Sequence, residues 1–229
     1  MLINKVVNMA DNSIDNKDVL FFLKSSLFGS EYSEKYNTDA GKIDLAIKRA
    51  YRDMNRTIDE DDKEKIKIEK CRVVDCLKGL IIEKQINKII DQPSFDAWHS
   101  KLCEAVTDKK FYTFGQAQKW VNMTLKYLLV LDYEPVLRLI QYLHVPIDKV
   151  VVGKALEGEH PLFDGNPDEY LPWSKKIKDG PKNNYYKFQD SLRKAIKGLH
   201  PIQWEFKAWN GDGISLNGYC DEKEAIRYT

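Results

Sequence analysis

Two residues near the middle of the chain have side chains and surroundings that would suit chemistry. Lys119 lies in the apolar stretch YTFGQAQKWVNMTLKYLLVL (residues 112–131), and Asp148 lies between apolar residues in LHVPIDKVVV. A deprotonated lysine amine attacks electrophilic carbon and forms a Schiff base, and a carboxylate removes protons or stabilises developing positive charge. The other interpretation is a lysine that extends from a core helix into solvent and an aspartate with a structural role. The elements that carry the two residues must decide between these interpretations.

The stretch that carries Lys119 predicts a buried helix. Thr113 and Gln116 fit the Thr-x-x-Gln capping box, in which each side chain bonds the backbone of the other residue, so we expect the helix to begin there. From this point to about Asp132 the residues are apolar around most of the helix circumference, which is typical of an interior helix. Lys119 and Lys126 are seven residues apart and so lie on roughly the same side. On such a helix, a lysine either extends to the surface or occupies a cleft where burial lowers its pKa.

The remaining sequence predicts an all-α fold. Apolar residues at three- and four-residue spacing predict helices over 16–28 and 40–58, and the segment 59–90 has the pattern of a long helix that Gly79 could interrupt. Ser94 is a candidate N-cap for a further helix. The segment VPIDKVVV has some strand character, but it is short and stands alone, so it predicts no sheet.

A segment rich in Pro and Gly, 157–173, is the best candidate for a long surface loop. It divides a helical body, 1–156, from a C-terminal helical subdomain, 157–229, which we expect to pack on the same body. The segment 173–200 contains eight Lys or Arg and two Asp, a local charge of +6, with tyrosine and phenylalanine interspersed. Such a stripe is compatible with a surface that contacts phosphate, and a solvated helix face is an equally good interpretation.

Composition narrows the class of protein. With 229 residues, a net charge of +1 and 43% apolar residues, the chain has the composition of a soluble globular protein. No apolar run approaches the roughly 18–20 residues that cross a bilayer, and polar residues come too early for a secretory signal. We therefore expect a cytoplasmic protein without a membrane partner. The cysteines and histidines lack zinc-ligand spacing, and no nucleotide-binding motif occurs, so we expect no metal and no cofactor. A monomer is the default expectation.

The sequence around Lys119 and Asp148 resembles that of the helix-hairpin-helix DNA glycosylases. In that family a Gly-x-Gly-x-Lys element opens the second helix of the hairpin, and a Pro-x-Asp element opens a later helix. FGQAQK supplies Gly115 and Lys119 at the matching positions, with Ala117 in place of the second glycine, and VPIDKVV supplies Pro146 and Asp148. The resemblance covers residues 112–151. The spacing between lysine and aspartate is most similar to that of the archaeal 8-oxoguanine glycosylases and of bacterial proteins with the same fold.

The resemblance implies a helical DNA-glycosylase-like fold with a helix-hairpin-helix element, and an enzyme that flips out and excises a damaged or modified base of duplex DNA. Lys119 would be the nucleophile and Asp148 the catalytic carboxylate, with strand cleavage by elimination if the lysine forms a Schiff base. If Lys119 points elsewhere, Asp148 would activate water and the enzyme would only release the base. The base would be 8-oxoguanine, or alternatively a modified base of phage DNA. A helical DNA- or protein-binding module without catalytic activity remains the alternative.

The resemblance and the basic segment together suggest which residues would contact DNA. Phosphates would meet the backbone N–H groups at the start of the helix and the lysines that follow Trp173. Stacking of the extruded base requires an aromatic residue near the catalytic pair. The predicted DNA-binding residues are Gly115, Gln116, Gln118, Lys175 and Lys176, and the predicted base-pocket residues are Trp173 and Trp120.

Overall fold

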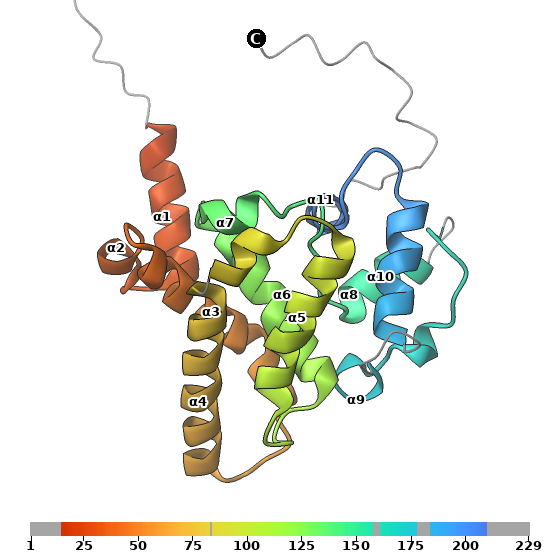
Figure 1. Cartoon of the computed structure of the whole chain (residues 1–229), viewed down its shortest axis with the longest axis horizontal. Coiled ribbons are helices and arrows are strands. Elements are labelled where there is room, and N and C mark those ends of the chain that lie inside the picture. Colours follow the sequence, from red (N-terminus) through yellow and green to blue (C-terminus); the bar gives the residue numbers. More distant parts are fainter. Residues whose placement is uncertain (1–14, 83, 158–160, 178–183, 210–229) are drawn as a thin grey trace, which may run out of the picture.

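The computed structural model describes residues 15–82, 84–157, 161–177 and 184–209. In these ranges the chain forms α-helices and short 3-10 helices and no strand, which confirms the all-α prediction. Figure 1 shows α6 in the middle of the molecule, with α3 and α4 on one side of it and α8 and α10 on the other. None of the helices in the described ranges is both long and apolar enough to cross a membrane.

The N-terminal elements begin at short polar caps. The side chain of Asp15 accepts the backbone N–H of Lys17, and the Thr38 hydroxyl accepts that of Gly41. These caps satisfy N–H groups that a helix start leaves without a partner. The elements are α1 (Asn16–Phe28), α2 (Tyr32–Lys35), α3 (Asp39–Met54) and η1 (Asn55–Thr57). The helices predicted over 16–28 and 40–58 are therefore confirmed, the second with a 3-10 turn at its end.

The next elements correct two predictions. The helix α4 (Lys63–Ile82) continues through Gly79 without a break, and η2 (Lys84–Lys88) follows it. The helix α5 (Gln92–Thr107) has Asp91 as its N-cap, whereas Ser94 is the third residue of the helix and closes a capping box with Asp91. Ser94 therefore stabilises the helix start from inside the helix.

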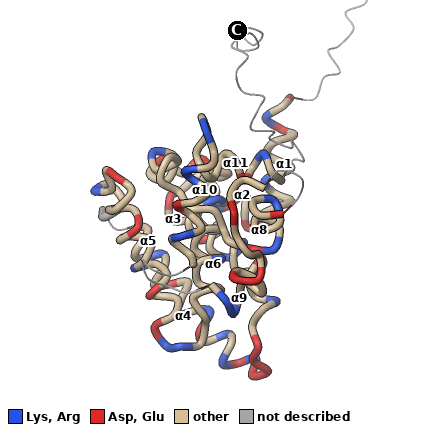
Figure 2. Tube along the Cα trace, turned by 90° about the vertical axis from the view of Figure 1, so that its right-hand side faces the viewer, with Lys and Arg blue, Asp and Glu red and all other residues tan. Residues whose placement is uncertain are grey.

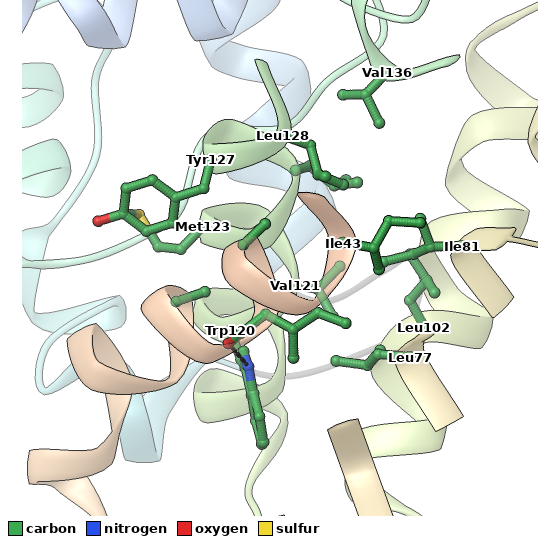
Figure 3. Close-up of a cluster of buried hydrophobic side chains, with 14 of the residues drawn as sticks. Ile43, Leu77, Ile81, Leu102, Trp120, Val121, Met123, Tyr127, Leu128 and Val136 are labelled. Atoms are coloured by element: carbon green, nitrogen blue, oxygen red, sulfur yellow. Dashed lines mark hydrogen bonds between the residues drawn. The ribbon is translucent and has the colours of Figure 1, made fainter. Parts of the chain in front are cut away.

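The helix α6 (Phe114–Val130) begins with the capping box that was predicted. The Thr113 hydroxyl accepts the N–H of Gln116, and the Gln116 side chain accepts the N–H of Thr113. The helix packs against α3, α5 and α9. Figure 3 shows Val121 and Leu128 on the side of α6 that faces Leu77 and Leu102, with Met123 and Tyr127 on another side. Burial of α6 between neighbours on several sides explains why its sequence is apolar almost throughout.

The remaining elements include those of a second core. They are α7 (Glu134–Leu137), whose Val136 belongs to the larger core, and α8 (Lys149–Leu156), η3 (Pro167–Glu169), α9 (Trp173–Lys176), α10 (Asn184–Ala195) and α11 (Pro201–Trp209). The segment with strand character is a loop followed by α8. Val145 and Val152 share one buried cluster with Tyr170, Phe188 and Trp204. Residues on both sides of position 156 thus belong to the same core, and Trp173 packs against this core and the larger one formed mainly by α1 to α7.

Candidate functional site

Lys119 and Asp148 meet in the structure. Lys119 lies in the second turn of α6 and Asp148 is the N-cap of α8, and the Lys119 Nζ donates a hydrogen bond to the Asp148 Oδ2. The side chains are only 7% and 12% exposed. The other carboxylate oxygen, Oδ1, accepts the N–H of Val151 at 2.9 Å. One oxygen therefore fixes the carboxylate on its helix and the other is directed at the lysine.

A buried amide holds the loop before Asp148 against α6. The Gln118 Oε1 accepts the N–H of Ile147 at 3.0 Å, and its Nε2 donates to the C=O of the same residue at 2.9 Å. One turn further along α6, the Asn122 Nδ2 donates to the C=O of Val145 at 3.3 Å. Two side chains of one helix thus satisfy the backbone of a segment that has no regular structure. This pairing places Asp148 within reach of Lys119.

A pocket of about 460 Å³ lies beside the ion pair. One wall is a single stripe of α6 formed by Lys119, Met123, Lys126, Tyr127 and Val130. The other walls come from α1, from α3 and the turn after it, from the start of α8, and from α9 and α11. The volume is within the range of small-molecule sites in proteins.

A second lysine with a buried carboxylate lines the middle of this pocket. The Lys126 Nζ donates to the Glu205 Oε1 at 2.7 Å, and the Trp209 Nε1 donates to the same oxygen at 3.0 Å. The ammonium also lies 4.7 Å from the centre of the Phe206 ring. Glu205 is 1% exposed, and in the described part of the chain its Oε2 has no hydrogen-bond partner. A buried carboxylate oxygen without a donor is costly, and Glu205 itself does not line the pocket.

The α3 side of the pocket carries a third set of polar groups. The Asp53 Oδ1 accepts from the Arg49 guanidinium at 2.6 Å, and its Oδ2 accepts from the Tyr127 hydroxyl at 2.6 Å. Burial, together with the Asp53 carboxylate, raises the pKa of Tyr127 above its usual value, so the hydroxyl remains a donor at neutral pH. Arg56 and Lys149 line the same pocket and are exposed.

The predicted base-pocket residues have different positions. Trp173, the first residue of α9, lines the pocket. Trp120 does not line it. Its ring is fully buried and packs on Tyr51 and Tyr112, and its Nε1 donates to the C=O of Ile47 at 3.0 Å. Adjacent residues of a helix point about 100° apart, which is why the neighbour of Lys119 belongs to the core.

The predicted DNA contacts at the start of α6 are not accessible in this structure. A Cβ on Gly115 would lie 2.2 Å from the Trp173 C=O, so the backbone of α9 covers this position. Gln116 is buried and its Nε2 donates to the C=O of Thr57 at 2.7 Å, and Gln118 is occupied by Ile147 as described above. Gln116 and Gln118 hold elements together, because their side-chain amides already have protein partners.

The predicted lysines of α9 are at the surface. Lys175 is exposed, with its Nζ 3.8 Å from the Asp59 carboxylate, and Lys176 is exposed and donates to the C=O of Asp168 at 2.6 Å. They follow Trp173 by two and three residues but do not line the pocket beside Lys119 and Asp148.

Several residues at the pocket were not identified from the sequence: Arg49, Asp53, Tyr127 and Phe206 of its lining, and the buried Glu205 behind Lys126. Lys126 was noted only for its position seven residues after Lys119. Its partner Glu205 is 79 residues away in the chain, and no local pattern connects the two.

Comparison of the chain with protein-family models, with curated proteins and with solved structures found no match. Within the described residues, no group of three or more His, Cys, Asp or Glu is arranged to hold a metal ion.

Proposed function

We propose that this protein is a DNA glycosylase that excises a modified base, with Lys119 as the nucleophile and Asp148 as its partner. The observation that carries the proposal is the contact between the Lys119 Nζ and the Asp148 Oδ2 on the wall of a pocket large enough for a nucleobase. The sequence resemblance requires these two groups to converge on one cleft. Their burial supports a chemical role, because a solvent-excluded pair interacts strongly and keeps water away from the reacting carbon.

The reaction that fits this pair begins with proton transfer. Within the existing hydrogen bond, Lys119 gives a proton to Asp148 and becomes a neutral amine. The amine attacks C1′ of the nucleotide, the bond between C1′ and the base breaks, and the base leaves with the electron pair and takes up the proton that Asp148 received. Asp148 is then a carboxylate again and stabilises the positive charge that develops on the sugar. Opening of the sugar ring then gives a Schiff base, from which strand cleavage by elimination follows.

The rest of the pocket supplies what an extruded base requires. Trp173 and the aromatic rings of Phe206 and Trp209 offer faces for stacking. Lys126 lines the pocket and offers a donor, and the buried Glu205 carboxylate behind it holds its ammonium in place. A base that presents an acceptor to this wall would meet the Lys126 ammonium. Such a wall favours bases with a polar edge over unmodified apolar ligands.

Exposed cations at the pocket would hold the DNA strand. Arg56 and Lys149 line the pocket and point into solvent-accessible space, and Lys175 and Lys176 lie on α9 next to Trp173. Figure 2 shows basic and acidic residues interspersed along the chain. What distinguishes these four cations is that they lie at or beside the pocket. We expect phosphate contacts here and a binding constant that falls with salt.

Borohydride trapping tests this proposal. The protein is mixed with duplexes that contain an abasic site or 8-oxoguanine, and the Schiff base is reduced to a stable adduct. We expect an adduct with the wild type and none with Lys119→Gln. Asp148→Asn retains an oxygen that can cap α8, so the helix should stay folded. We expect this variant to release the base about 10²–10⁴-fold more slowly, a loss that would come from the missing carboxylate.

Lys101→Gln is the matched control, since Lys101 is an exposed lysine of α5 outside the pocket. This variant should form the adduct as the wild type does. An adduct that persists in Lys119→Gln would contradict the proposed nucleophile.

A module without catalytic activity is the second candidate, and one observation favours it. The Lys119–Asp148 pair and the cap on α8 together satisfy both carboxylate oxygens, as a structural ion pair would. In that case no base is released and no adduct forms, while DNA binding persists and Lys119→Gln lowers the stability. The same trapping experiment with a binding assay separates the two candidates.

A further inference from the structure

The pocket is longer than a nucleobase. Its α6 wall extends from Lys119 to Val130, eleven residues that correspond to about 16 Å along the helix axis. The Lys119–Asp148 pair, where C1′ would lie, is at one end, and Leu27 of α1 joins Val130 at the other. A base placed between Lys119 and Lys126 would occupy about 10 Å of this length. The part of the pocket beyond Lys126 would then remain empty.

The groups around this far part are polar and have unused hydrogen-bonding capacity. The Asp53 carboxylate accepts one bond on each oxygen, from Arg49 and from Tyr127, and each oxygen can accept another. The Arg49 guanidinium donates one of its five N–H bonds to Asp53. All three residues line the pocket, and the ring of Tyr127 provides an apolar surface beneath the Arg49 guanidinium, 5.2 Å from its centre.

The charges in this part are balanced. Arg49 pairs with Asp53, so one positive group faces one negative group. A phosphate or carboxylate would meet the repulsion of the Asp53 carboxylate as well as the attraction of the Arg49 guanidinium. Neutral hydroxyl groups, which donate and accept, suit a wall that presents both kinds of partner.

We propose that the far part of the pocket, lined by Arg49, Asp53 and Tyr127, is a subsite for a neutral polyhydroxylated substituent on the excised base, such as a sugar attached to a pyrimidine. This inference rests on the proposed glycosylase function and specifies its substrate class. Lys119 and Asp148 act at C1′, Lys126 and the aromatic rings of α11 hold the base, and the subsite binds the substituent. Tyr127→Phe is the most conservative change of the subsite, because it removes one hydroxyl and keeps the ring.

The test compares duplexes that differ only in the substituent: 5-hydroxymethylcytosine and its glucosylated derivative. Base release is measured under single-turnover conditions, and trapping on an abasic duplex is measured in parallel. We expect the wild type to release the glucosylated base faster. Tyr127→Phe and Asp53→Asn should each lower the ratio of the two rates by about two- to tenfold, the effect of one lost hydrogen bond. Their thermal unfolding is recorded to verify that both variants are folded.

Each outcome has a definite meaning. A preference for the glucosylated base that both variants reduce supports the subsite. An adduct on abasic DNA without preference for the glucosylated base overturns the subsite and leaves the proposed function intact. Absence of both adduct and base release with all duplexes overturns the proposed function and the subsite together.

Discussion

Gln118 forms two hydrogen bonds with the backbone of Ile147, one to its N–H and one from its amide to the C=O. Both residues are fully buried, and the remaining amide capacity of Gln118 is used by Gly115 and Asn122. The contact joins α6 to the segment that ends at Asp148. The ion pair at the pocket thus depends on a polar residue that itself does not line the pocket.

Replacement of Gln118 by Leu should therefore lower the stability. It would leave the N–H and C=O of Ile147 buried without partners, which costs about 2–4 kcal/mol in total. Urea denaturation measures this loss. Ser100→Ala, which removes an exposed hydrogen bond to Glu104, should change the stability by less than about 0.5 kcal/mol. A Gln118→Leu variant as stable as the wild type would show that water or a backbone shift replaces these bonds.

Two glycines provide a matched pair for a second prediction. A Cβ on Gly115 would lie 2.2 Å from the Trp173 C=O, and a Cβ on Gly79 would meet nothing within 4 Å. Gly115→Ala must push α9 away and should cost about 1–3 kcal/mol. Gly79→Ala, in the interior of α4, should stabilise by about 0.5–1 kcal/mol because alanine favours the helix.

Thermal unfolding of both variants checks these opposite signs. Because α9 begins with the pocket residue Trp173, Gly115→Ala should also change the tryptophan fluorescence. Equal effects of the two substitutions would mean that α9 moves without cost.

The local parts of the fold were predictable from the sequence, and the pocket was predictable only in part. Thr113 and Gln116 interact across one helical turn, so their capping box follows from their spacing alone. A serine hydroxyl can stabilise a helix start from the N-cap or from the third helical position, so the sequence indicates Ser94 as the N-cap. In the structure Asp91, three residues earlier, is the N-cap of α5. Gly79 does not interrupt α4, because one glycine costs an otherwise well-packed helix only about 1 kcal/mol.

The positions that could not be predicted depend on contacts between distant segments. Gln116 and Gln118 are polar residues at a helix start, a pattern equally typical of a DNA contact and of buried amide bonds. Only the position of α9 over Gly115 and of Ile147 beside Gln118 decides between them. The same holds for Glu205, whose role depends on the docking of α11 against α6 through Lys126.

A third prediction concerns this second ion pair. Lys126→Met leaves the buried Glu205 carboxylate with only the Trp209 N–H as a donor, and breaking a buried pair in this way costs about 3–5 kcal/mol. Glu205→Gln keeps a neutral acceptor for Lys126 and should cost less. Since the loss in Lys126→Met comes from the uncompensated carboxylate, the double variant Lys126→Met/Glu205→Leu should regain part of the stability.

Chemical denaturation of Lys126→Met, of the single variant Glu205→Leu and of the double variant forms a double-mutant cycle. A coupling energy near zero would contradict the pairing of Lys126 with Glu205, because independent residues give additive losses.

The fourth prediction concerns acid stability and depends on two buried histidines. His99 lies against Asn122 at 2.9 Å and Tyr185 at 3.2 Å, and His144 lies 2.9 Å from the Tyr185 hydroxyl and 3.0 Å from the Asp96 carboxylate. Burial lowers the pKa of His99 from 6.5 to about 3, and burial also lowers that of His144, although Asp96 opposes the shift. Both rings are therefore neutral in the folded protein at pH 7.

The sign of the pH dependence follows from these shifts. Below pH 6.5 the unfolded chain protonates its histidines and the folded protein does not, so the stability is complete above this pH and falls with acidification until about pH 3. His99 alone should contribute a loss of about 1.4 kcal/mol per pH unit, or roughly 4–5 kcal/mol over the whole interval. Urea denaturation between pH 8 and pH 4 measures the slope. His99→Gln should reduce it by about 1.4 kcal/mol per pH unit. An unchanged slope in His99→Gln would assign the acid sensitivity to other groups.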